Sequence, residues 1–170
     1  MFKQKYLYNI FYFFQFRLNN MKAVVQRVAK AKVTIEGRIA GEIGEGLLVL
    51  LAMAESDTKD EMKWMANKLV NLRVFPDEED KMNRSVLDIG GGIMLISNFT
   101  IYGDLRKGFR PNFMKAAPPD IAEPLYNDML EYMRSEFPIR IAAGEFGAMM
   151  DIELINSGPV TVIIEKENTK

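Results

Sequence analysis

A continuous apolar run at residues 46–52, with the sequence Gly-Leu-Leu-Val-Leu-Leu-Ala, constrains the fold of this chain more than any other segment. A strand with one face in water alternates apolar and polar residues, whereas a strand covered on both faces is apolar throughout. We therefore expect residues 46–52 to form the central strand of a sheet, with other elements packed against both of its faces.

Shorter patterns on both sides of this run predict further strands. They cover residues 23–28, 32–35, 39–43, 93–101, 150–154 and 160–164. Residues 41–46, Gly-Glu-Ile-Gly-Glu-Gly, resemble a phosphate-binding loop, but they precede a strand and lack the Lys-Ser/Thr pair that such a loop needs. We interpret residues 41–46 as a hairpin turn.

Two helical patterns interrupt the strands. Thr58 and Glu61 have the spacing of a capping box, and apolar residues follow them at helical intervals. A second helix is predicted from Asp120, whose cap is completed by Glu123, to the Phe-Pro pair at residues 137–138. Strands separated by two main helices predict a single α/β domain with a mixed, strongly curved sheet or barrel.

The composition limits the chemistry that the chain can perform. It has no His and no Cys, which excludes an imidazole base, a thiolate nucleophile, a disulfide framework and a thiolate metal site. The carboxylates are scattered, so we expect no metal and no cofactor. A hydrophobic fraction of 48% is typical of a globular domain, and the absence of Cys suits a cytoplasmic protein.

The charge balance limits the partners. A protein that holds long stretches of nucleic acid by their phosphates carries a basic excess, whereas the formal net charge here is −1. We therefore expect no DNA partner and only local contact with RNA. A basic loop at residues 106–111, Arg-Lys-Gly-Phe-Arg-Pro, is either an ordinary solvated loop or such a local phosphate contact.

The first twenty residues differ from the rest of the chain, because they are rich in aromatic residues and contain no acidic ones. A signal peptide is disfavoured, since Asn9, Gln15 and Arg17 interrupt the apolar stretch and no small-residue cleavage site follows. The stretch is also too short to span a bilayer, so we expect no membrane partner. We interpret residues 1–20 as an extension outside the fold and residues 21–170 as the domain.

Polar groups interrupt the predicted strand at residues 93–101, in the motif Ser97-Asn98-Phe99-Thr100-Ile101. Two hydroxyls and an amide at a strand end are commonly no more than a polar terminus with satisfied hydrogen bonds. The end of a rigid strand is also where a sheet protein positions reacting groups. The sequence alone leaves both interpretations open.

A second motif, Asn-Ser-Gly-Pro-Val-Thr at residues 156–161, precedes the last predicted strand. The simplest interpretation is a turn between two strands. The alternative is that the Gly158-Pro159 bond is cis, which costs an X-Pro bond only about 0.5–1 kcal/mol and would fix a particular backbone geometry.

The two motifs occur together with three other segments: Ala-Val-Val-Gln-Arg-Val at 23–28, Gly-Glu-Ile-Gly at 41–44 and Arg-Pro at 110–111. Through these segments, residues 21–164 closely resemble the D-aminoacyl-tRNA deacylase family of bacteria and eukaryotes. The resemblance implies a homodimer that hydrolyses the ester between a D-amino acid, or glycine, and the 3′ end of tRNA. Such an enzyme performs chiral proofreading in translation.

The resemblance also implies roles for particular residues. Ser97, Phe99 and Thr100 would form the reactive part of the pocket, and Ala117 and Met150 would line it. Gly158 and Pro159, joined by a cis bond and braced by Arg27, would enter from the partner subunit and block the side chain of an L-amino acid. Asn98 replaces the Gln that is usual in the family, so its amide has a shorter reach.

Two mechanisms are compatible with this resemblance. Thr100 could act as a nucleophile, but no His is present to activate it and it is not an N-terminal threonine. The alternative, which we favour, uses backbone N–H groups near Phe99 and Thr100 to polarise the ester carbonyl, while the ribose 2′-hydroxyl of the substrate helps to activate water.

Two rival functions come from other classes. The basic loop at residues 106–111 is compatible with a non-catalytic nucleic-acid-binding protein, although the net charge of −1 argues against it. A general esterase would leave the Gly158-Pro159 motif unexplained.

Overall fold

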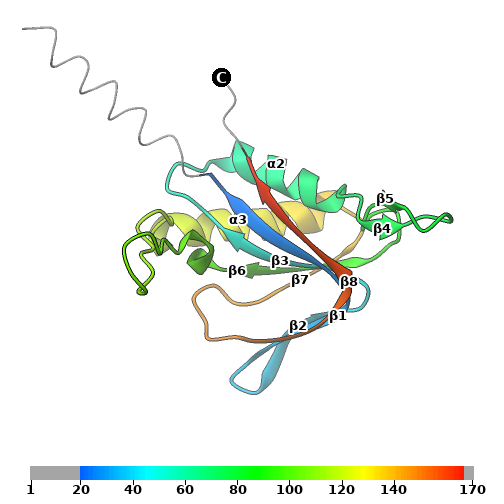
Figure 1. Cartoon of the computed structure of the whole chain (residues 1–170), viewed down its shortest axis with the longest axis horizontal. Coiled ribbons are helices and arrows are strands. Elements are labelled where there is room, and N and C mark those ends of the chain that lie inside the picture. Colours follow the sequence, from blue (N-terminus) through cyan, green and yellow to red (C-terminus); the bar gives the residue numbers. More distant parts are fainter. Residues whose placement is uncertain (1–19, 167–170) are drawn as a thin grey trace, which may run out of the picture.

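One long strand, β1 (Lys22–Ile35), organises the sheet in the computed structural model, which describes residues 20–166. Along one edge β1 pairs antiparallel with β8 (Asp151–Glu165). On its other edge the first half of β1 pairs with β3 (Gly46–Ala52) and the second half with β2 (Arg38–Ile43), both antiparallel. Figure 1 shows β1 between these neighbours.

The sheet continues in parallel from β3. β3 pairs with β6 (Gly92–Ser97), and β6 pairs with β7 (Arg140–Ala143). A separate small hairpin is formed by β4 (Phe75–Pro76) and β5 (Met82–Arg84), which enclose a turn with the sequence Asp-Glu-Glu-Asp-Lys at residues 77–81. The main sheet is therefore mixed, as the strand and helix pattern predicted.

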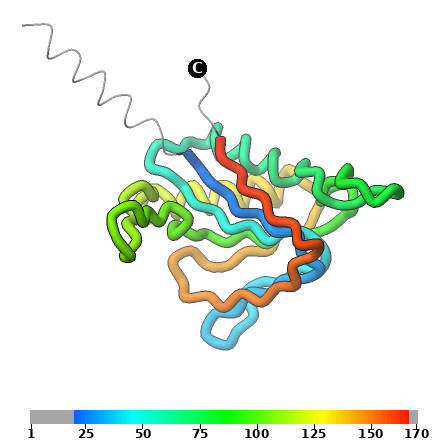
Figure 2. The backbone as a smooth tube through the Cα atoms, in the orientation of Figure 1, coloured from blue at the N-terminus to red at the C-terminus, as the bar shows by residue number. Residues whose placement is uncertain are grey.

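The sheet curls into a nearly closed barrel. Figure 2 shows β8 bending near its middle, so that its first half turns away from the direction of its second half. The register between β1 and β8 shifts at this point, and bulges of this kind increase the twist and bend of a strand. At the far side β2 approaches β7 so closely that a Cβ atom on Gly41 would lie 2.9 Å from the Ala143 carbonyl oxygen.

Two helices, α2 (Lys59–Val70) and α3 (Pro119–Glu136), cover one face of the sheet (Figure 1). Alternate residues of the central strands point to opposite faces, so Val49 packs with the helices whereas Leu48 packs inside the barrel. The prediction that residues 46–52 are buried on both faces is thereby confirmed. The prediction of an α/β domain with a curved mixed sheet and two main helices is confirmed as well.

Of the two predicted helix caps, one is present and one is not. Thr58 and Glu61 form the predicted capping box at the start of α2. α3 instead begins with Pro118 as its N-cap and Pro119 as its first residue, so the predicted Asp120–Glu123 cap is wrong. A proline at the first helical position loses nothing, because its missing N–H would have no partner there. The helix ends at Phe137, as predicted.

Several predicted strand boundaries are wrong because β1 and β8 pair with each other along almost their whole length, through the predicted breaks. Residues 23–28 and 32–35 belong to the single strand β1, and residues 150–154 and 160–164 fall largely within the single strand β8. Residues 41–43 belong to β2, and β2 and β3 both pair with β1, so residues 41–46 are no hairpin turn.

A buried carboxylate, that of Asp57, accepts a hydrogen bond from the backbone just before β1. The Met21 N–H donates to Asp57 Oδ1 at 3.0 Å, and the Ala54 N–H donates to Asp57 Oδ2 at 2.7 Å. The hydroxyl of Tyr102 donates to the carbonyl of Asn20. The predicted extension at residues 1–20 otherwise lies outside the described residues.

Burial dominates the ionisation of Asp57. The side chain is only 8% exposed, and this desolvation raises the pKa of its carboxyl group from 3.8 to about 6, although the two N–H donors act in the opposite direction. Because the folded state then binds a proton more tightly than the unfolded state, this group contributes less stability as the pH rises from about 4 to about 6.

Asp57→Asn tests this linkage. The asparagine oxygen can accept only one of the two buried N–H groups, so we expect a loss of about 1–3 kcal/mol in the free energy of unfolding at pH 4. The difference from the parent should shrink as the pH rises to 7, since only the parent loses a proton from this site. Urea unfolding of both proteins at a fixed protein concentration measures this, and a difference that grows with pH would contradict it.

Candidate functional site

A cavity of about 760 Å³ opens at the end of β6, where the strand meets the 3₁₀ helix η1 (Phe99–Tyr102). Its walls contain six residues that the sequence had singled out, namely Ser97, Asn98, Phe99, Thr100, Ala117 and Met150. They come from three separate parts of the chain, and the fold brings them together. The predicted strand at residues 93–101 is wrong in its last part, because β6 ends at Ser97.

Asn98 explains why the strand ends there. Its backbone N–H donates to the Leu51 carbonyl at 2.7 Å, which continues the pairing with β3 by one residue. Its side-chain oxygen then accepts from the Thr100 N–H at 3.2 Å and from the Thr100 hydroxyl at 2.5 Å. Asn98 is therefore the N-cap of η1, and its amide orients Thr100.

Among residues 20–166, the hydroxyl of Thr100 contacts no base that could activate it. It donates to the Asn98 amide oxygen, and an amide oxygen does not take up a proton near neutral pH. The chain contains no His, and the described lining of the cavity contains no Asp, Glu or Lys. This arrangement orients the Thr100 hydroxyl, and the described residues that line the cavity supply no base beside it.

Phe99 supplies a different polar group. Its ring is 56% exposed and packs edge-on against Phe113, with 5.1 Å between the ring centroids. Among residues 20–166, its backbone N–H has no hydrogen-bond acceptor, whereas the N–H groups of Asn98 and Thr100 on either side do. Phe99 lines the cavity, so its backbone N–H is a candidate donor to a ligand oxygen there.

Much of the cavity wall was not foreseen from the sequence. Phe113, Ala116, Phe146 and Met149 line it, and all of them come from loop segments without a strand or helix period. The one available signal was the apolar character of residues 146–149, which adjoin Met150. The wall is largely apolar, so it can exclude water from a bound ligand.

Gly158, Pro159 and Arg27 lie apart from this cavity and do not line it. Thr161 pairs with Gln26 and Asn156 pairs with Val28, so residues 157–160 form a bulge opposite Arg27. The Gly158-Pro159 bond is cis, and the pair lies inside β8, so its interpretation as a turn between two strands is wrong.

Arg27 holds this bulge. Its Nε donates to the Ser157 carbonyl at 3.2 Å and its Nη1 donates to the Val74 carbonyl at 2.5 Å. Gly158 has a φ of +122°, and a Cβ atom at this position would lie 2.7 Å from Nη2 of Arg27. The Gly-Pro pair itself is exposed to solvent in the single chain.

The described residues offer neither a metal site nor a membrane-spanning helix. Within residues 20–166, no group of three or more acidic side chains is placed to hold a metal ion. In the same part of the chain, no helix has the length and apolarity needed to cross a membrane.

Comparison with known proteins gives a consistent result. Residues 24–165 match the family model described as D-Tyr-tRNA(Tyr) deacylase. A D-aminoacyl-tRNA deacylase from Geobacillus sp. (strain WCH70) is 52% identical over 147 residues, covering 86% of this chain and 96% of that protein. The enzyme of the same name from Thermus aquaticus is 52% identical over 145 residues, covering 85% of this chain and 95% of its own.

Two solved structures share the fold. The c-Myc DNA Unwinding Element Binding Protein superimposes with a TM-score of 0.81 at 42% identity, covering 86% of this chain and 99% of that one. A probable eukaryotic D-amino acid tRNA deacylase superimposes with a TM-score of 0.74 at 15% identity, covering 86% of this chain and 100% of that one. At this low identity the similarity supports the fold alone.

Gly158→Ala tests the packing of the bulge against Arg27. A side chain at a φ of +122° and 2.7 Å from Nη2 should lower the free energy of unfolding by about 1–3 kcal/mol. Gly37→Ala is the matched control, because Gly37 also has a positive φ but has no atom within 4 Å of its Cβ position. A Cβ at Gly158 would also lie 2.8 Å from Cγ2 of Val160, so equal losses in urea unfolding of the two variants would show that the close contacts with Arg27 and Val160 are unimportant.

Proposed function

The chain belongs to the D-Tyr-tRNA(Tyr) deacylase family, and on this premise we propose that the cavity beside η1 is the place where it hydrolyses its substrate. The protein is a D-aminoacyl-tRNA deacylase, an ester hydrolase that acts in tRNA proofreading. The observation that carries the proposed site is the free Phe99 N–H at the edge of an apolar cavity that contains Ser97 and Thr100. Its substrate is handled in the cytoplasm, where we expect the enzyme.

The Phe99 N–H is the electrostatic element of the proposed mechanism. It donates to the ester carbonyl oxygen and stabilises the negative charge that develops there as water attacks. A donor of this kind is typically worth about 2.7–4 kcal/mol in the transition state. The 2′-hydroxyl of the terminal ribose helps to activate the water, so the substrate supplies the group that this His-free chain lacks.

Asn98 and Thr100 act by position in this scheme. The Asn98 amide caps η1 and thereby fixes the direction of the neighbouring Phe99 N–H. The side chain of Asn98 remains long enough to reach Thr100 at 2.5 Å, although it is one methylene shorter than the Gln expected from the resemblance. Ser97 and Thr100 offer hydroxyls to the ribose and the attacking water, while Ala117 and Met150 provide apolar wall.

Chiral selection requires a second subunit in this proposal. Gly158 and Pro159 are exposed, lie outside the cavity of their own chain and are held in place by Arg27. β8 pairs only with β1 among the described strands, and it carries the exposed side chains Ile155 and Ile163. An edge strand that exposes large apolar side chains such as these is suited to an interface between two copies of the chain.

The selection works by exclusion. The backbone carbonyls of the partner's Gly-Pro pair occupy the space that the side chain of an L-amino acid needs, whereas a D side chain points elsewhere. Glycine has no side chain to exclude and is accepted. Such a filter needs no contact with the favoured side chain, so it is broad across D-amino acids.

DNA binding is the alternative suggested by the name of the 42% identical structure. The net charge of −1 does not favour extended phosphate contact, and a DNA-binding role would leave the apolar cavity without a ligand. Incubation with D-tyrosyl-tRNA separates the two functions, since only the deacylase releases free tyrosine.

Thr100→Ala distinguishes the two mechanisms. The substitution leaves the Phe99 N–H in place, so we expect the single-turnover rate on D-tyrosyl-tRNA to fall by no more than about tenfold. Loss of a true nucleophile costs far more than about 10³-fold. Thr100→Ser is the matched control, because a nucleophilic mechanism requires that it alone retain activity.

Wild-type protein should hydrolyse D-tyrosyl-tRNA at least about 10²-fold faster than L-tyrosyl-tRNA, and it should also hydrolyse glycyl-tRNA. The measurement compares kcat/KM for the matched substrates at one salt concentration. Similar rates on the D and L substrates would contradict the filter. Sedimentation of the active enzyme as a single chain would contradict the contribution of the second subunit.

A further inference from the structure

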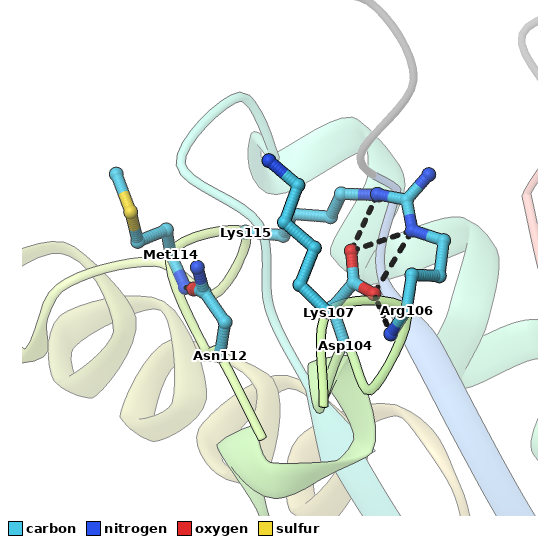
Figure 3. A pocket seen from close by; sticks show the side chains of 6 residues that line it. All are labelled: Asp104, Arg106, Lys107, Asn112, Met114 and Lys115. Atoms are coloured by element: carbon cyan, nitrogen blue, oxygen red, sulfur yellow. Dashed lines mark hydrogen bonds and ion pairs between the residues drawn. The ribbon is translucent and has the colours of Figure 1, made fainter. Parts of the chain in front are cut away.

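A second hollow adjoins the cavity on the other side of residues 112–117. Its volume is about 470 Å³, and it is lined by Asp104, Arg106, Lys107, Asn112, Met114 and Lys115 (Figure 3). Phe113, Ala116 and Ala117, from the same short segment, line the cavity beside η1. Lys115 and Phe113 are two residues apart, so their Cα atoms are separated by at most about 7 Å. One wall is therefore shared by the two spaces.

The second hollow is cationic. Its one acidic residue, Asp104, is already paired, because Nε of Arg106 donates to both of its oxygens at 2.9 Å. This guanidinium holds the pKa of Asp104 well below its usual range, so the pair stays ionic and nearly neutral overall. Lys107 and Lys115 form no ion pair within residues 20–166, and Figure 3 shows Lys107 extending away from the Arg106–Asp104 pair.

The loop also exposes two large apolar side chains. Phe109 is fully exposed at 103% and Met114 is 90% exposed, and neither packs on the core. Free cations next to an exposed aromatic ring are the combination that single-stranded nucleic acid uses, since phosphates bind the cations and bases stack on the ring. An acidic peptide would satisfy the lysines but would leave Phe109 without a partner.

We propose that residues 104–115 bind the single-stranded 3′ end of the tRNA substrate, with Lys107 and Lys115 on its backbone phosphates and Phe109 stacked on a base. This proposal rests on the proposed function, because it places the esterified terminal nucleotide in the neighbouring cavity. From that cavity the RNA strand passes over Phe113 into the cationic hollow. Only a few phosphates are held, which agrees with a protein whose net charge is −1.

In this proposal the two spaces recognise different parts of the substrate. The cavity recognises the ester, and the loop recognises the nucleotides that precede it. A small ester without phosphates would use the cavity alone. D-Tyrosyl-adenosine is such a substrate, since it has the same ester and ribose as D-tyrosyl-tRNA but no phosphate.

The experiment compares Lys107→Gln, Lys115→Gln and the double variant with the parent on both substrates over a range of salt concentrations. Lys81→Gln is the matched control, because Lys81 is an exposed lysine of the β4–β5 hairpin, at the opposite end of the molecule from η1 in Figure 1. We expect the double variant to lose at least about tenfold in kcat/KM on D-tyrosyl-tRNA at low salt and to match the parent on D-tyrosyl-adenosine.

The salt dependence identifies the phosphate contacts. For single strands each contact contributes about 0.7 to the slope of log kcat/KM against log salt, so the double variant should lose about 1.4 from this slope and Lys81→Gln nothing. Phe109→Ala should weaken the reaction with tRNA without changing the slope.

Two outcomes would overturn the proposal. They are an unchanged reaction of the double variant with tRNA, and an equal loss on both substrates, which would show damage to the cavity itself. Failure of the proposed function is distinguishable from both, because the parent would then hydrolyse neither substrate.

Discussion

The parallel pairing of β3 with β6 determines where the site lies. The register runs from Gly46 opposite Gly92 to Leu51 opposite Ser97, and the Asn98 N–H adds a last hydrogen bond to the Leu51 carbonyl at 2.7 Å. Beyond that bond the chain leaves the sheet and turns into η1 under the cap of Asn98. The unpaired N–H of Phe99 is a direct result, because it belongs to the residue that has left the strand and has not yet entered the ladder of the helix.

A site whose main polar group is a backbone N–H needs neither His nor Cys. A backbone N–H needs no activation and keeps its direction as long as the strand end and the cap persist. In the proposed mechanism, the apolar wall from Phe113 and Met150 excludes water and so strengthens the interaction of this N–H with the oxyanion. The proposed chemistry therefore depends on the fold as a whole more than on any single reactive side chain.

Local signals in the sequence were enough for the elements whose stability is local or whose burial is complete. The apolar run at residues 46–52 and the Thr58–Glu61 capping box both appear as predicted, since each leaves a pattern that one short window contains. Ser97 and Thr100 stood out for a related reason, namely that polar residues occupied what looked like a buried strand. Family resemblance then added Ala117 and Met150, which lie across the same cavity.

Features that depend on distant pairing were not predictable in this way. Gly158 and Pro159 carry strong turn signals, yet pairing on both sides with β1 keeps them inside β8 as a bulge. The strand predicted at residues 93–101 is too long, because the end of β6 depends on its last backbone hydrogen bond, from Asn98 to Leu51 of another strand. Phe113 and Phe146 reach the cavity from loops, where no periodicity indicates which side chains point inward.

The most direct test of the account is a crystal structure with a D-tyrosyl-adenosine analogue in which an amide replaces the labile ester. The account predicts the tyrosyl carbonyl oxygen within hydrogen-bond distance of the Phe99 N–H, about 2.7–3.1 Å. It also predicts the Gly158-Pro159 pair of a second chain facing the substrate Cα on the side that an L side chain would occupy. A ligand bound outside the cavity, or a carbonyl oxygen turned away from the Phe99 N–H, would contradict it.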